Sequence, residues 1–135
     1  MLEHHLFLSD IRDWFKENFD TSDFQQVSIG KIDNNLEKAL CFYDSKRTIP
    51  YINRMQLSTY SIKPITVLIR YGKNHDIAEH RIHDLYEFFD NLTTLINGIK
   101  VFFKFEIENP IDLGTDDKGY VELSLEIDCF YERSI

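Results

Sequence analysis

The acidic residues near the end of the chain are the first place to look for chemistry. Asp112, Asp116 and Asp117 lie close together and are followed by Lys118. A carboxylate followed by a carboxylate–x–lysine pair is the pattern by which many nucleases hold magnesium and activate water. Here both parts lie on one turn-rich stretch, whereas that chemistry requires them on adjacent strands. A nuclease is therefore an alternative hypothesis, which predicts loss of activity when Asp112 or Lys118 is changed.

Metal sites of other kinds match the sequence no better. An EF-type calcium loop needs oxygen ligands at alternating positions and a glycine at the sixth, a spacing that the three aspartates do not keep. His80 and His83 share a helix face as two metal ligands do, but no HExxH pattern or complete zinc set accompanies them. The sequence also lacks a GxSxG motif and a glycine-rich phosphate loop. We therefore expect exposed histidines, no metal, no cofactor and no enzymatic activity.

A row of acidic residues marks the last predicted strand, residues 121–131. Glu122, Glu126 and Asp128 alternate there with apolar residues. Alternation of this kind predicts a strand with one buried face and one solvent-exposed, acidic face. We interpret the acidic face either as an ordinary solvated surface or as a surface that a negatively charged polymer passes without binding.

The composition predicts one globular domain, residues 1–135. Hydrophobic residues make up 43% and aromatic residues 14% of the 135 residues, which is enough for an ordinary core. The formal charge of −8 argues against general binding to DNA or to anionic membranes. Cys41 and Cys129 lie in apolar runs and are expected to be buried free thiols. No apolar run reaches the ~20 residues of a transmembrane helix, and the first residues do not resemble a signal peptide, so we expect a cytoplasmic origin.

The elements that must position these residues follow from the periodicity. Helices are predicted over residues 2–19 and 74–92, the second with Asn74 as its N-cap. The predicted strands are residues 25–30, 39–43, 56–62, 65–71, 99–108 and 121–131. The first two strands are expected to form a hairpin, and Pro64 is expected at a strand start or an edge. The order predicts an α+β fold with two helices packed on a mostly antiparallel sheet of five to six strands.

Several segments carry a family resemblance. They are the strand ending Ile29-Gly30, the ALCFYD strand (39–44), the Arg70-Tyr71-Gly72 strand end, the helix AEHRIHDLYEFFDNL (78–92), and Pro110, Leu113-Gly114, Asp116 and Gly119 before the last strand. In this pattern the chain resembles a family of small phage proteins, the minor capsid or tail completion proteins, which are similar to the tail terminators of long-tailed phages. The resemblance covers roughly residues 6–131.

The resemblance implies a structural protein of a phage or prophage. Members of this group look like ring-forming proteins, so six copies of the chain are expected to close into a ring on the end of the tail tube. The expected partners are other copies of the chain, the tail tube protein and a neck or head-completion protein, with DNA passing through unbound. The protein is then expected in the virion after assembly in the cytoplasm of the bacterial host. The alternatives are a head-completion or neck connector protein and an interaction module that forms no ring.

Two loops and one strand supply the residues expected to carry this role. Loops 44–55 and 109–119 would project from the sheet and contact a neighbouring subunit or the tube. The candidate contact residues are Lys46, Arg47, Tyr51, Arg54, Asp112, Asp116 and Asp117. The acidic row Glu122, Glu126 and Asp128 would line the channel of the ring and repel DNA, an expectation that rests only on charge.

Overall fold

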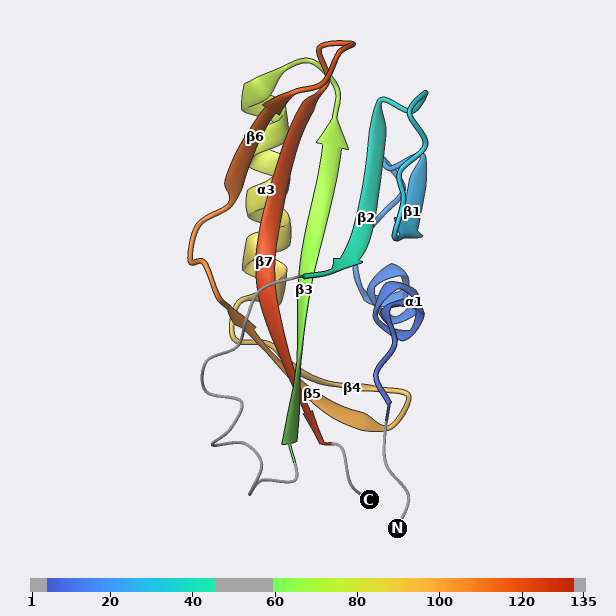
Figure 1. Ribbon diagram of the computed structural model, residues 1–135, viewed down its shortest axis with the longest axis vertical. Helices are drawn as coiled ribbons and strands as arrows, with labels where there is room; N and C mark the ends of the chain where they lie inside the picture. Colours follow the sequence, from blue (N-terminus) through green and yellow to red (C-terminus); the bar gives the residue numbers. More distant parts are fainter. Residues whose placement is uncertain (1–4, 46–59, 133–135) are drawn as a thin grey trace.

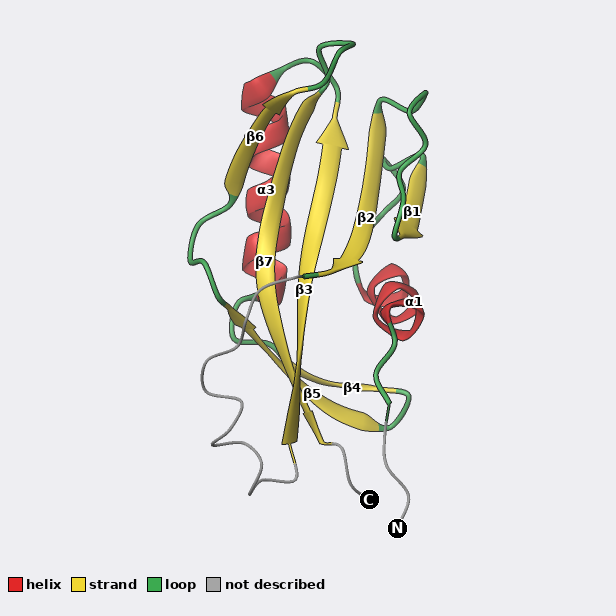
Figure 2. Ribbon diagram, viewed as in Figure 1, coloured by secondary structure: helices red, strands yellow, loops and turns green. Residues whose placement is uncertain are grey.

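The computed structural model describes residues 5–45 and 60–132, and these form an α+β fold (Figure 1). In this part of the chain two helices and seven strands follow the order α1 (Leu8–Asn18), β1 (Gln26–Ile29), β2 (Lys38–Asp44), β3 (Tyr60–Tyr71), α3 (His75–Phe89), β4 (Thr93–Ile96), β5 (Ile99–Phe105), β6 (Ile111–Thr115) and β7 (Val121–Glu132). The strands make one curled sheet (Figure 2). The predicted fold class is confirmed.

The last strand, β7, is the centre of the sheet. The strand order is β1-β2-β3-β7-β5-β4, and β6 also pairs with β7. One edge of β7 pairs with β3 along its length, while the other edge pairs first with β6 and then with β5. All of these pairings are antiparallel except that of β1 with β2.

The hydrophobic core lies between the two helices and one face of the sheet. The alternating apolar residues of β7 all point into it, as predicted. Phe15, Phe89 and Phe103 are completely buried there. The Trp14 ring stacks on Phe103 with 5.3 Å between centroids, and its Nε1 donates to Thr94 Oγ1 at 3.2 Å. The core therefore joins α1 to the far end of the sheet.

The predicted hairpin of the first two strands is wrong, because β1 and β2 run parallel. A strand of four residues is only about 13 Å long, so residues 30–37 are long enough to run back beside it. Side chains of the first strand region hold this return loop. Gln25 Oε1 accepts from the backbone N–H of Glu37 and of Lys38, both at 2.9 Å, and Gln26 Oε1 accepts from Asp33 N at 3.1 Å.

The predicted position of Pro64, at a strand start or on an edge strand, is wrong. Pro64 lies within β3, opposite Asp128 of β7. The Pro64 carbonyl accepts from Ser45 N at 2.9 Å, so the ring nitrogen of Pro64 faces the same way, toward the end of β2. The missing N–H therefore costs no hydrogen bond to β7. The predicted strand residues 56–59 lie outside the described part.

Two short strands, β4 and β6, were missing from the prediction. A turn at Asn97-Gly98, with positive φ at both residues, joins β4 to β5. Residues 111–115 had been interpreted as turn, but they pair with β7 through an irregular register at Asp112 and Gly114.

The predicted helices are shorter in the structure. Helix α1 begins only at Leu8, while α3 begins after Asn74, whose Oδ1 accepts from Ile77 N at 3.2 Å, as predicted. Among the described residues, neither helix has the length and hydrophobicity to cross a membrane. Cys41 and Cys129 are buried thiols that form no disulfide, as predicted.

Candidate functional site

Arg70 is a buried cation on the sheet face that the helices do not cover. Its neighbours in the sequence, Ile69 and Tyr71, belong to the core on the other side of β3. Arg70 lies between Ala39 of β2 and Glu122 of β7, and only 6% of its surface is exposed. A guanidinium so far from water needs partners from the protein itself.

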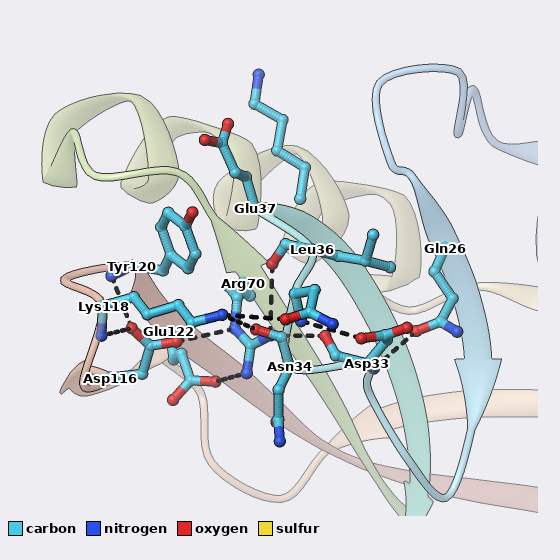
Figure 3. A network of polar contacts seen from close by, with 12 residues as sticks. Gln26, Asp33, Asn34, Leu36, Glu37, Arg70, Asp116, Lys118, Tyr120 and Glu122 are labelled. Atoms are coloured by element: carbon cyan, nitrogen blue, oxygen red, sulfur yellow. Dashed lines mark hydrogen bonds and ion pairs between the residues drawn. The ribbon is translucent and has the colours of Figure 1, made fainter.

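The partners of Arg70 come from three parts of the chain (Figure 3). Its Nη1 donates to the carbonyl oxygens of Asp33 at 3.0 Å and Leu36 at 3.4 Å. Its Nη2 donates to Glu122 Oε2 at 3.3 Å, and its Nε lies 3.4 Å from Asp116 Oδ2. The return loop 30–37, strand β7 and the turn after β6 therefore meet at one side chain.

Asp116 organises the turn between β6 and β7. Its Oδ1 accepts from the backbone N–H of Lys118 and of Tyr120, both at 2.9 Å. Desolvation acts to raise the pKa of the Asp116 carboxyl, but the N–H groups of Tyr120 and Lys118, together with the Arg70 charge, hold that pKa below its ordinary value. The carboxylate is thus committed to its own turn and to Arg70.

Lys118 makes the second connection between this turn and the return loop. Its Nζ donates to the Asn34 carbonyl at 3.1 Å and to Asn35 Oδ1 at 3.3 Å. A hollow of about 250 Å³ remains between the two segments, lined by Asn34, Arg70, Asp116, Asp117 and Lys118. We call the contacts of Arg70, Asp116, Lys118 and Glu122 with loop 30–37 the Arg70 junction. It contains no paired nucleophile and base, and its effect is mechanical, because it fixes two loops against the sheet.

A third connection joins β6 to the start of α3. His75 Nε2 lies 2.8 Å from Asp112 Oδ2, and both side chains are about half exposed. The hydrogen bond to Asp112 raises the pKa of His75. The backbone N–H of Gly114, followed by His75, lowers the pKa of Asp112. This pair therefore holds the edge strand β6 most strongly when the histidine is protonated.

A separate polar cluster surrounds Arg81 of α3. Its Nη2 donates to Asp23 Oδ1 at 2.8 Å and to the Asp20 carbonyl at 2.7 Å, while Nη1 donates to Asp84 Oδ2 at 3.3 Å. The Tyr71 hydroxyl also donates to Asp23, and desolvation together with this bond raises the pKa of Tyr71 to about 12. A hollow of about 380 Å³ opens beside the cluster.

Sequence analysis missed both arginine clusters, for a reason that the geometry makes plain. Glu122 lies 52 residues from Arg70 and Asp23 lies 58 residues from Arg81 in the chain, so these pairs leave no local pattern. The one available signal was Arg70 itself, a charged residue that directly follows the apolar run 67–69 of the strand. Its alternation with the core residues of β3 placed it on the opposite face.

The aspartates of the alternative nuclease and calcium patterns do not come together. Asp112 contacts His75 and Asp116 contacts Arg70, while Asp117 is exposed. The nuclease and calcium patterns therefore have no shared metal position in this structure. His80 and His83 are exposed on α3, as expected. Among residues 5–45 and 60–132 no group of three or more histidine, cysteine or carboxylate side chains could hold a metal.

The expected solvent exposure of the acidic row is wrong. Glu126 is 9% exposed and Asp128 is 2% exposed, and Glu122 is the partner of Arg70. Glu126 Oε1 accepts a hydrogen bond from Ser45 Oγ at 3.2 Å, and Asp128 lies between Pro64 of β3 and Lys104 of β5. That this row borders a channel in an assembly stays a prediction. The other candidate contacts, Lys46, Arg47, Tyr51 and Arg54, lie outside the described residues.

The comparison with protein families identifies the family of the chain. The model of a family described as bacteriophage tail terminator protein matches residues 12–133. The chain belongs to this tail terminator family. Comparison with curated proteins found no match. Membership makes the protein a structural component of a phage tail and so of the virion, which confirms the resemblance seen in the sequence.

Proposed function

We propose that this tail protein forms a ring of six copies that caps the end of the tail tube and joins it to the neck. The observation that carries the proposal is the family match, which extends over nearly the whole fold, from α1 to the end of β7. A protein that ends a tube needs no active site. It needs one surface for the tube, one for the neck and two different side surfaces for its neighbours.

The Arg70 junction supports the proposal because it gives the protomer a rigid end. Loop 30–37 and the turn 116–120 would otherwise be separate surface loops, and a rigid contact surface loses less entropy when a neighbour binds. Asp112 and Asp117 are exposed at this end and remain proposed contact residues. Asp116 is a positioning residue for the turn, since its carboxylate is already occupied. Lys46, Arg47, Tyr51 and Arg54 stay proposed contacts on the other loop.

The net charge supports the passage of DNA through the ring without binding. A protomer with a formal charge of −8 carries the same sign as the phosphate backbone. The proposed partners are therefore proteins: other copies of the chain, the tail tube protein and a neck protein. Assembly in the cytoplasm of the bacterial host is part of the proposal.

The proposal is tested by tube assembly. Purified chain is added to tail tube protein of the same phage while tubes grow, and tube lengths and tube ends are measured by electron microscopy. A terminator stops growth and leaves a six-fold ring on one end of each tube. Tubes that grow to the same length with and without the chain, and that carry no ring, would contradict the proposal and favour a neck protein.

A further inference from the structure

Among the seven described strands, β6 is the one that the hydrophobic core does not hold. Each of the other strands places at least one apolar side chain in a core cluster or packs one against it, and β6 places none. Residues 112–115 are exposed, and Leu113 keeps 51% of its surface accessible. Elements with few buried apolar contacts open at a lower free energy than the rest of a fold. Strand β6 should therefore be less stable than its neighbours.

The pairing of β6 with β7 is also interrupted. The register shifts between Asp112 and Gly114, so the two strands share two short stretches of pairing and no continuous ladder. Pro110, directly before the strand, has no N–H to donate. The segment before it, residues 106–109, is exposed. Neither side-chain burial nor a regular ladder therefore fixes this part of the chain.

Both ends of the region are fixed. At one end the backbone N–H of Glu106 donates to the Glu126 carbonyl at 3.1 Å. At the other end Asp116 is held by its own turn and by Arg70. The segment between these anchors, residues 107–115, can leave β7 without disturbing the rest of the sheet or the Arg70 junction. We call it the β6 flap.

The contact between His75 and Asp112 joins the β6 flap to a rigid helix. His75 is the first residue of α3, which packs in the core, and its Nε2 lies 2.8 Å from Asp112 Oδ2. In the described part of the chain, this is the one side-chain hydrogen bond or ion pair that leaves the flap. Imidazole changes its charge near neutral pH, so the strength of this contact depends on protonation.

We propose that the β6 flap opens from β7 while the rest of the fold stays intact, and that protonated His75 latches it closed. An open flap leaves the edge of β7 unpaired at residues 121–124 and releases Asp112 from α3. This is a property of the single protomer, so it goes beyond the proposed ring and does not depend on it.

The charges around His75 set the direction of the pH dependence. The hydrogen bond to Asp112 of the flap raises the pKa of His75, and the charges of Asp112, Glu79 and Asp76 act in the same direction, the last two from α3 itself. The contribution of the latch is therefore present below pH 6.5 and is lost as pH rises through the raised pKa. The flap should open more often at higher pH.

Hydrogen exchange measured by NMR tests the opening. Protection factors compare each exchange rate with that of an unstructured chain and so remove the intrinsic effect of pH. The amides of β6 should be at least about tenfold less protected than those of β5, which pairs with the same strand. In low concentrations of urea the protection of β6 should stay constant while that of β5 falls, because a local opening exposes little new surface.

The latch is tested at about pH 5.5 and about pH 8, on either side of the ordinary histidine pKa. Protection of β6 should fall about twofold to fivefold between the two values, as expected for a half-exposed ion pair. Asp112→Asn keeps an oxygen for the Gly114 N–H but loses the charge, so at about pH 5.5 it should show the low protection that the wild type shows at about pH 8. His80→Gln is the matched control and should keep the wild-type pH dependence, because His80 titrates on the same helix but contacts Asp76 of that helix.

Two results would overturn the inference. Amides of β6 that are as protected as those of β5, and equally sensitive to urea, would show that β6 leaves β7 only when the whole chain unfolds. A pH dependence of β6 protection that is the same in Asp112→Asn and in the wild type would show that His75 does not act through this contact. Either result leaves the ring proposal as it stands, because neither concerns contacts between copies of the chain.

Discussion

Arg70 shows how one residue can organise a surface formed from distant parts of a chain. Its side chain contacts two backbone carbonyls of the return loop, a carboxylate of β7 and a carboxylate of the following turn. Each partner compensates part of the cost of removing a guanidinium from water. Removing the arginine leaves two carboxylates and two carbonyls without their cation, so the effect should exceed that of losing an exposed charge.

Arg70→Met is therefore expected to lower the free energy of unfolding by about 2–3 kcal/mol. This is below the cost of breaking a fully buried pair, because Glu122 and Asp116 keep some contact with water. Urea denaturation of the purified chain measures the change. Lys118→Ala is the control, with an expected loss of no more than about 1 kcal/mol. Equal losses of unfolding free energy in the two variants would contradict the central role of Arg70 in the junction.

His75 and Asp112 predict a pH dependence at the β6 edge. The pKa of His75 is raised in the folded chain, so its contribution is fully present below the ordinary value of 6.5 and disappears as pH rises through the raised pKa. The pKa of Asp112 is lowered, so its contribution is present above 3.8 and disappears as pH falls through the lowered pKa. Their bond should thus be strongest between about pH 4 and 6.5.

NMR titration of the His75 ring tests this pair. Asp112→Asn should bring the pKa of His75 down toward its ordinary value, because the bond to the carboxylate is its main cause. Asp117→Asn, in the following turn, should leave that pKa nearly unchanged. A His75 titration that is the same in the wild type and in Asp112→Asn would contradict the assignment.

At the scale of the elements, the periodicity of the sequence correctly predicted which faces are buried in the core. The alternation of β7 and the apolar stripes of both helices each reported one buried face, and those faces meet in the core. The capping of α3 by Asn74 was equally local. Features that depend on a partner far away in the chain were missed. Strand β6 forms by pairing with β7, whereas the sequence of residues 111–115 taken by itself contains turn-forming signals.

The errors have the same origin. The sequence between β1 and β2 is compatible with a hairpin, but the strands pair in parallel, and the side chains of Gln25 and Gln26 hold the return loop. The acidic residues of β7 alternate correctly, but their exposure depends on what covers the second face of the sheet. Periodicity reports which residues share a face and does not report whether water reaches both faces.

Gln25→Ala tests the parallel arrangement. Its Oε1 accepts from two consecutive backbone N–H groups, so its removal should speed hydrogen exchange at Glu37 and Lys38 and destabilise the chain by about 1–2 kcal/mol. Gln25→Glu keeps an acceptor at this position and should retain most of the protection. Unchanged exchange at both amides in Gln25→Ala would show that the side chain does not hold the loop.

At the scale of the whole molecule, charge and architecture agree with a structural role. The acidic protomer predicts no measurable retardation of double-stranded DNA in a gel, even at a low salt concentration of about 50 mM, where phosphate contacts are strongest. A protein of similar size with a basic surface serves as the control. Binding that weakens steeply with added salt would contradict the expectation that DNA passes the ring without being held.

Mass in solution tests the central claim most directly. Light scattering behind a sizing column gives the mass of the chain at rising concentration, first alone and then with short tail tubes. The account predicts a species of six chains, free in solution or formed on the tube ends, starting from a 16.1 kDa protomer. A chain that remains at the mass of one protomer under every condition, and does not bind the tubes, would contradict it.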